Sequence, residues 1–327
     1  MIDPAEAAIY LLIFPGFAFL LLYALFCEWV DRIVYARLQN RAGPPVFQPL
    51  ADLLKLLSKE DIIPKYADRA LFQYTPLIAF AAVMVPIMNI PIWGTKALYP
   101  LQGDLILTLY LLSIPTLALF VIGWSSTSLY STVGAFRAAT MLFGYEVPLV
   151  LTCLSAGILS GSWCISDITS YLASHPSGML VLAPGFIIAL IALEAKLERP
   201  PFDISLAETE IVGGTLTEYS GKKLAVMHLV ADLAMVIGVS LVAAVFLGGL
   251  MVGSGTFIIA GTDLTPFLNF SLYIAKTLGI VFLLAVIRTL FARLRIDQML
   301  DFSWKYLAVG GIFQLFLVIL YAGMYQG

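Results

Sequence analysis

The chain has 327 residues, of which 61% are hydrophobic and 12% are charged, and its net charge is −3. Soluble domains carry about 25% charged residues, so this composition excludes a soluble globular protein and indicates an integral membrane protein. Cys27, Cys153 and Cys164 are scattered without a CxxC pair, which predicts no metal or iron–sulfur site in this chain. The acidic start, MIDPAEAA, is not typical of a cleavable signal peptide.

Eight apolar runs are long enough to cross a bilayer, since a spanning helix needs about 20 predominantly apolar residues. These runs lack the alternation of a membrane β-barrel. We therefore predict an all-α integral membrane protein, a bundle of about eight transmembrane helices forming one membrane domain over residues 1–327. The predicted spans are residues 8–29, 71–92, 104–124, 141–161, 179–197, 224–250, 269–291 and 306–325.

Basic residues gather in the connections that follow every second span. Of the 18 Lys and Arg residues, 16 lie in these connections or at the span ends beside them, Lys96 falls in an opposite connection, and Lys276 lies deeper inside a span. By the positive-inside rule, the basic connections face the cytoplasm and both termini lie outside. The basic residues that set this orientation are Arg32, Arg37, Arg41, Lys55, Lys59, Lys65, Arg69, Arg137, Lys196, Arg199, Lys222, Lys223, Arg288, Arg293, Arg295 and Lys305.

The first cytoplasmic connection, residues 31–70, is long and contains the segment VFQPLADLLKLLSKED. Four leucines in it fall at helical spacing, and the charged side chains fall elsewhere. This pattern predicts an amphipathic helix at the membrane interface, and the same helix can also cap the bundle. The leucines are Leu50, Leu53, Leu54 and Leu57, and the charged residues are Asp52, Lys55 and Lys59.

The most polar stretch, residues 197–223, lies between two long apolar runs and reads LERPPFDISLAETEIVGGTLTEYSGKK. Five carboxylates stand there against three basic residues, so we expect an acidic working surface, which we call the coupling loop. Two of its residues also have structural interpretations: Asp203 can cap a helix after the two prolines, and Arg199 can pair with Glu198 or Asp203. The carboxylates are Glu198, Asp203, Glu208, Glu210 and Glu218.

Several charges fall inside or at the ends of the spans, where a mid-bilayer charge costs at least about 2.5–3.5 kcal/mol. As a set they predict a proton or ion path, because buried carboxylates can exchange protons near neutral pH. The alternative is static pairing, for example of Glu194 or Asp232 with Lys196 or Lys276. His228, four residues before Asp232, is a relay or a hydrogen-bonded structural histidine. The predicted path residues are Glu28, Glu146, Glu194, Asp232 and Lys276.

Four blocks in this order resemble the membrane subunit of respiratory complex I that joins its peripheral arm to its membrane arm. They are LQNRAGPPVFQPLADLLKLLSKED, GWSSTSLYSTVGAFRAATMLFGYEV, ERPPFDISLAETEIVGGTLTEYSG and RTLFARLRIDQMLDFSWK. The connection GPPVFQPLAD is short, as in the counterpart from membrane-bound nickel–iron hydrogenases. Lys196 and Leu206 replace carboxylates of the quinone-reducing relatives.

The resemblance implies a subunit without catalytic residues or a redox centre of its own. Iron–sulfur clusters, and in hydrogenases a nickel–iron site, would lie in peripheral partner subunits, with antiporter-like subunits as membrane partners. It further implies location in the cell membrane, contact with lipid and no nucleic-acid partner. Glu208, Glu210 and Glu218 would sense charge changes in the peripheral arm. Docking would involve Arg137, Arg199, Arg293 and Arg295.

Three functions stay open from the residues alone. The first is the coupling subunit of a hydrogenase-like complex, moving H⁺ or Na⁺, with a sulfur-reducing complex as a related case. The second is a quinone-site subunit, which predicts an open amphiphilic cavity between spans 1 and 6 and the amphipathic helix. The third is a stand-alone secondary transporter, which predicts helices broken at mid-membrane.

Overall fold

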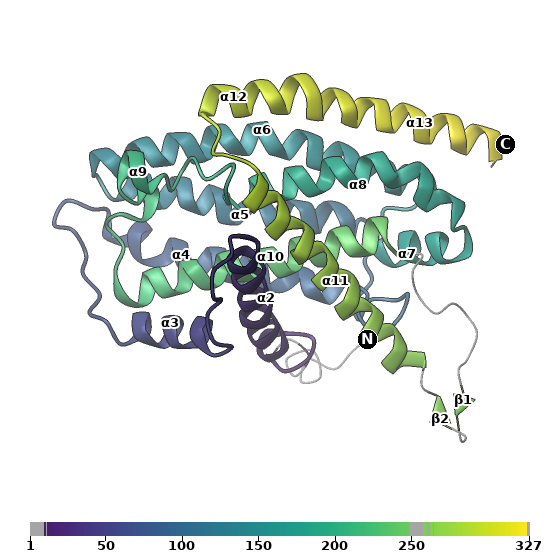
Figure 1. Cartoon of the computed structure of the whole chain (residues 1–327), viewed down its shortest axis with the longest axis horizontal. Helices are drawn as coiled ribbons and strands as arrows, with labels where there is room; N and C mark the ends of the chain where they lie inside the picture. Colours follow the sequence, from purple (N-terminus) through teal and green to yellow (C-terminus); the bar gives the residue numbers. More distant parts are fainter. Residues whose placement is uncertain (1–9, 11, 249–257, 260–261, 264, 326–327) are drawn as a thin grey trace.

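The computed structural model describes residues 10, 12–248, 258–259, 262–263 and 265–325. Long helices form a bundle, with shorter elements at its ends (Figure 1). The bundle helices are α2 (Phe17–Leu38), α4 (Arg69–Met84), α5 (Asp104–Ser125), α6 (Leu129–Ser160), α8 (Ser177–Lys196), α10 (Gly221–Phe246), α11 (Thr265–Leu290) and α13 (Val309–Tyr325). The short elements are α3 (Gln48–Leu57), η1 (Val85–Asn89), α7 (Ile165–Ser174), α9 (Glu208–Ile211), η2 (Gly214–Leu216), β1 (Ile258–Ile259), β2 (Thr262–Asp263), α12 (Ile296–Phe302) and the π-helical η3 (Ser303–Ala308).

The helices confirm an all-α membrane bundle, to which β1 and β2 add one two-residue antiparallel pair. Within the described residues, seven stretches are long and apolar enough to cross a membrane. Helix α2 is 22 residues long but carries Glu28, Asp31 and Arg32 in its second half, so it is not among the seven. The seven stretches are Arg69–Asn89, Asp104–Ser125, Leu129–Ser160, Ser177–Lys196, Gly221–Phe246, Thr265–Leu290 and Ile296–Met324.

Helix α10 forms the centre of the bundle and packs against α2, α4, α8 and α11 (Figure 1). In the most hydrophobic stretch of this helix, 78% of the residues are buried. From Leu233 to Phe246 the helix is apolar on all sides apart from Ser240, has no polar face to turn outward, and is buried throughout. Helix α13 instead packs on one flank, against α6 and α8.

The helices extend beyond the predicted spans mainly where charged residues flank the apolar run. Helix α2 runs to Leu38 rather than ending at residue 29, because Glu28 and Asp31 are buried among other helices and do not mark the membrane edge. Helix α6 begins at residue 129 instead of 141, and α12, η3 and α13 continue one another from residue 296 instead of 306.

The first connection consequently starts at Gln39, inside the expected range 31–70. It contains α3, which occupies the segment that predicts an amphipathic helix. Leu53 packs against the core, whereas Leu50 and Leu54 are exposed. The exposed leucines therefore leave an apolar face that is free to contact lipid.

Candidate functional site

The coupling loop folds against the bundle at the end that also holds α3 and the turn 291–295; we call this the basic end. The loop can fold back on itself because Gly214 has a φ of +53° and lies against the Ser205 carbonyl, where a Cβ atom would be 1.8 Å from that oxygen. Only glycine fits at this position. The short α9 and η2 therefore lie beside α6 and α5.

Two arginines from other elements hold the outer part of the coupling loop. Arg137 of α6 donates to Glu210 at 2.5 Å, and Arg293 donates to the Asp203 carboxylate at 2.8 Å and to Thr209 at 3.0 Å. The hydrogen bond from Arg137 lowers the pKa of Glu210. Burial raises the pKa of Asp203 to about 6, against the opposing effect of Arg293. The expected helix-capping role of Asp203 is not among its described contacts.

Arg295, Glu208 and Glu218 lie apart from these pairs. Arg295 is exposed at the start of α12, and Glu208 is exposed on α9. Glu218 is half-buried shortly before α10. Glu208 is therefore available to a partner on the outer surface of the loop.

The inner part of the coupling loop is tied to α2 through Arg199. This guanidinium donates to Glu28 at 3.0 Å and lies 3.3 Å from Asp31. Asp31 is fully buried and also accepts a hydrogen bond of 2.7 Å from Arg288 at the end of α11. Two carboxylates and two arginines thus join α2, the loop and α11. Arg199 pairs here and not with Glu198 or Asp203.

Glu194 lies beside this cluster, near the end of α8. Its side chain is completely buried, and neither carboxylate oxygen has a hydrogen-bond partner among the described residues. It is close enough to Arg199 and Asp31 to interact with their charges. An unpaired buried carboxylate is costly unless it is neutral or its surroundings change. Glu194 is therefore a buried carboxylate whose surroundings are set by the charges of Arg199 and Asp31.

A second polar group lies where α8 faces α6 and α5. Lys196 donates to Glu146 at 2.8 Å, and Glu146 accepts a further hydrogen bond of 2.5 Å from Ser113. Lys196 also lies 5.3 Å from the centre of the Tyr145 ring. Lys196 is thus paired with Glu146, and not with Glu194 or Asp232 as the static alternative has it.

Glu198 begins the coupling loop two residues after Lys196. One of its oxygens accepts a hydrogen bond from Ser205, and the other is buried without a partner among the described residues. Burial raises the pKa of Glu198 to about 7. Its carboxyl group is consequently poised to exchange a proton near neutral pH.

Lys276 is separate from these groups. Its ammonium donates at 3.2 Å to the carbonyl of Leu247, which follows the last turn of α10, away from the basic end. A cation at the carboxyl end of a helix is favourable because the last carbonyls point toward it. The structure therefore does not join Lys276 to Glu194 or Asp232.

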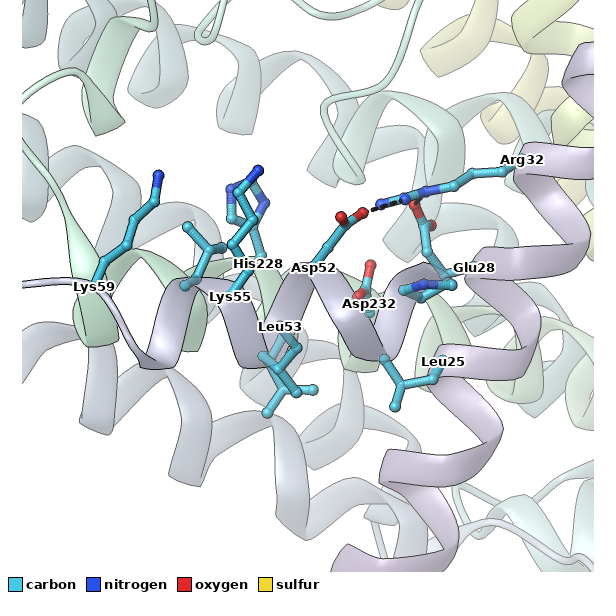
Figure 2. Close-up of a pocket in the computed structure, with 12 residues that line it drawn as sticks. Leu25, Glu28, Arg32, Asp52, Leu53, Lys55, Lys59, His228 and Asp232 are labelled. Carbon is cyan, nitrogen blue, oxygen red and sulfur yellow. Dashed lines mark hydrogen bonds and ion pairs between the residues drawn. The ribbon is translucent and has the colours of Figure 1, made fainter. Parts of the chain in front are cut away.

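A cavity of about 300 Å³ opens between α2, α3 and α10 (Figure 2). Asp232 and Glu28 line it, and Arg32 bridges Glu28 at 2.7 Å and Asp52 of α3 at 2.8 Å. It lies where a quinone-site subunit predicts an amphiphilic cavity. The charged residues around it are Glu28, Arg32, Asp52, Lys55, Lys59 and Asp232, with His228 beside them.

The predicted site residues do not include four charged partners found here: Asp31, Arg32, Asp52 and Arg288. Their only sequence signal is charge near a helix end, which also fits a solvated surface. No group of three or more His, Cys, Asp or Glu side chains in the described part of the chain is arranged to hold a metal ion.

Comparison with known proteins gives these features a context. The family model described as NADH dehydrogenase matches residues 10–319. The chain belongs to the NADH dehydrogenase family. It is 37% identical over 298 residues to the H subunit of NADH-quinone oxidoreductase from Dehalococcoides mccartyi strain CBDB1, covering 89% of this chain and 80% of that protein. The corresponding protein of Bacillus cytotoxicus is 36% identical over 327 residues, covering 94% and 93% of the two chains.

This member of the NADH dehydrogenase family also resembles a solved structure. A chain of the membrane-bound sulfane sulfur reductase, an archaeal respiratory membrane complex, superposes with a TM-score of 0.77 at 25% identity. The match covers 92% of this chain and 97% of that one. The family expected from the sequence is thereby confirmed, as is a multi-pass helical membrane protein. The similar structure comes from the sulfur-reducing class that the sequence left open beside the hydrogenases.

Proposed function

We propose that the chain is the non-catalytic membrane anchor and coupling subunit of a multisubunit respiratory complex in the cell membrane. Its basic end would face the cytoplasm, with both termini outside. Peripheral partner subunits would carry the iron–sulfur clusters and a nickel–iron or equivalent site. Antiporter-like membrane partners would complete the H⁺ or Na⁺ route.

The observation that carries this proposal is Glu194, a completely buried and unpaired carboxylate beside Arg199 of the coupling loop. Arg199 also holds Glu28 and Asp31. A partner that moves the loop would change the charge next to Glu194, and a carboxylate in low-dielectric surroundings responds to such a change by binding or releasing a proton. Glu28, Glu146 and Asp232 extend the polar groups on either side.

The assignment of roles follows the positions of the side chains. Glu208, Glu210 and Glu218 would sense the peripheral arm, while Arg137, Arg293 and Arg295 would hold the loop or the docked partner. Asp203 would fix the loop to Arg293. Lys276 would act at a later, separate point of the ion route, because its described contact is with the far end of α10.

The test is Glu194→Gln in the intact complex, reconstituted in liposomes, with soluble-donor activity and ion uptake measured together. Gln keeps the shape but cannot exchange a proton, so we expect an assembled, redox-active complex whose ion uptake per electron falls at least about fivefold. Exposed Glu60→Gln, at the basic end, is the matched control. Wild-type uptake per electron in Glu194→Gln would contradict the proposal.

A second candidate is a quinone-site subunit, favoured by the cavity between α2, α3 and α10. Quinone copurifying with the complex, and activity lost on its extraction, would support that function. The transporter alternative predicts helices broken at mid-membrane, whereas α5, α6, α8 and α10 run without a break.

A further inference from the structure

His228 occupies a position shared by two cavities. It lies on α10 one helical turn before Asp232 and lines the 300 Å³ cavity, here called the outer cavity (Figure 2). It also lines a second cavity of about 90 Å³, the inner cavity, enclosed by α5, α10, the end of α8 and the coupling loop. Of the residues around these two cavities, His228 alone belongs to both.

Groups that exchange protons stand on both sides of the imidazole. In the outer cavity they are Asp232 and Glu28, and in the inner cavity they are Lys196 and Glu198. The Glu198 oxygen without a partner is buried. At about 30 Å³ per water, the inner cavity has room for about three waters, enough to bridge an imidazole and a carboxylate.

The neighbouring connection through Arg199 is unfavourable for a proton. Its guanidinium lies between α2 and Glu194, paired with Glu28 and close to Asp31. A fixed arginine charge repels protons in a narrow polar passage. The imidazole of His228 carries no permanent charge, and no hydrogen bond to another described residue fixes its ring between the two cavities.

We propose that His228 passes protons between the outer and the inner cavity, which deepens the proposed coupling function and rests on it. A neutral imidazole takes a proton on one ring nitrogen from a water or carboxyl group of the outer cavity and becomes an imidazolium. The other nitrogen then releases its proton to the Glu198 carboxylate or to a water beside it. The ring returns to its first tautomer by rotation, and no electron is transferred.

A proton that reaches Glu198 arrives beside a second polar group. Glu198 is two residues from Lys196, whose ammonium holds Glu146. A proton arriving at Glu198 therefore changes the charge beside the Lys196–Glu146 pair without crossing Arg199. His228 thus links the outer cavity to the polar group between α8 and α6.

The charged groups facing His228 set the pH dependence of the transfer. Every segment that lines the two cavities contributes charged residues except α5. Because four acidic and four basic residues line the two cavities, protonation of His228 adds one positive charge to a balanced environment. The facing groups are Glu28 and Arg32 of α2, Asp52, Lys55 and Lys59 of α3, Asp232 of α10, Lys196 of α8 and Glu198 of the coupling loop.

The test uses the whole complex in liposomes with an internal pH indicator. In His228→Phe and His228→Gln we expect redox activity within about twofold of wild type and proton uptake reduced at least about tenfold. External imidazole should restore a substantial part of this uptake, because the outer cavity is open to a small base. His175→Phe, on an exposed residue at the end of α7, is the matched control.

Two results overturn the inference, and Glu194→Gln then distinguishes its failure from that of the proposed function. Wild-type proton uptake in both variants excludes His228 from the route, and a loss that imidazole does not restore in either variant indicates a structural role. If Glu194→Gln blocks uptake while the His228 variants do not, the relay is wrong and the proposed function stands. If none of these variants changes uptake, the coupling function itself is wrong.

Discussion

Glu194, Lys196 and Glu198, at and just beyond the end of α8, lie two residues apart in the sequence but reach three different surroundings. Residues two apart on a helix point about 200° apart. Glu194 therefore faces the Arg199 cluster, whereas Lys196 faces Glu146 of α6. Glu198, just beyond the helix, turns to Ser205. Three residues in sequence thus serve three different surroundings.

Burial of Glu198 predicts a pH dependence of stability. Its folded pKa, about 7, exceeds its usual value of 4.5, so the folded protein binds more protons than the unfolded chain between these pH values. Stability should accordingly fall as pH rises from about 4.5 to about 7, by at most about 3 kcal/mol. Thermal unfolding of the detergent-solubilised protein across this range measures the effect.

Glu198→Gln should flatten this contribution, because Gln does not ionise. Glu208→Gln, on the exposed surface of α9, is the control and should retain the wild-type slope. An equal slope in wild type and Glu198→Gln would show that another group is responsible.

At the residue scale, the sequence predicts which residue types are unusual but not their partners. Glu194 stands out as a carboxylate in an apolar run, yet its lack of a partner depends on how α8 is rotated. The Lys196–Glu146 pair depends equally on rotation of α6. Apolar composition on all sides of both helices leaves that rotation undetermined.

At the scale of elements, glycines set how closely α5, α6 and η2 approach. A Cβ atom on Gly134 of α6 would lie 2.6 Å from the Thr215 nitrogen. A Cβ atom on Gly123 of α5 would lie 2.5 Å from the Ser131 carbonyl oxygen. The coupling loop thus rests directly on the α6 backbone.

Gly134→Ala should push the coupling loop away from α6. Overpacking of this kind costs about 1–3 kcal/mol, and we expect faster hydrogen exchange in residues 204–217. Gly279→Ala is the matched control, since nothing lies within 4 Å of its added Cβ, and alanine there should stabilise α11 by about 0.5–1 kcal/mol. Unchanged exchange in Gly134→Ala would mean that the contact adjusts without moving the loop.

The elements themselves are largely predictable, because each long apolar run becomes a helix. The ends of the helices are less predictable, because polar residues usually mark the membrane edge. Glu28 and Asp31 are instead neutralised inside the bundle, and α2 continues past them. The cavity beside α3 is not deducible from the run of leucines, since it depends on the Arg32–Asp52 bridge to α2.

At the scale of the whole molecule, ion pairs join helices that are far apart in the sequence. Asp31 and Arg288 are 257 residues apart and 2.7 Å from each other. Breaking a buried pair costs about 3–5 kcal/mol, because the remaining charge is left unpaired. We therefore expect Asp31→Asn or Arg288→Gln to lower stability by about this amount.

The double variant should lose less than the sum of the single losses, and thermal unfolding in detergent measures this difference. Lys305→Gln, which breaks an exposed pair with Asp301, is the control and should cost at most about 0.5 kcal/mol. Strictly additive losses would show that Asp31 and Arg288 do not interact in solution.

Docking of a peripheral partner belongs to the same scale. Glu208 is exposed on the outer surface of the coupling loop. Glu208→Lys should weaken retention of the peripheral subunits, measured by pull-down in mild detergent at low salt. Charge reversal of exposed Lys96, in a connection expected on the opposite side, should leave retention unchanged. Equal retention in both variants would place the partner elsewhere.

The long separation between the charges of α2 and their partners has a consequence for synthesis. At about 5–20 residues per second, Arg199 is made about 9–34 s after Glu28, and Arg288 about 13–51 s after Asp31. Until then Glu28 has only Arg32, one turn along the same helix, and Asp31 has neither of the arginines that pair with it in the finished protein. The pairing of Asp31 in the first bundle helix is thus completed by a residue from the last third of the chain.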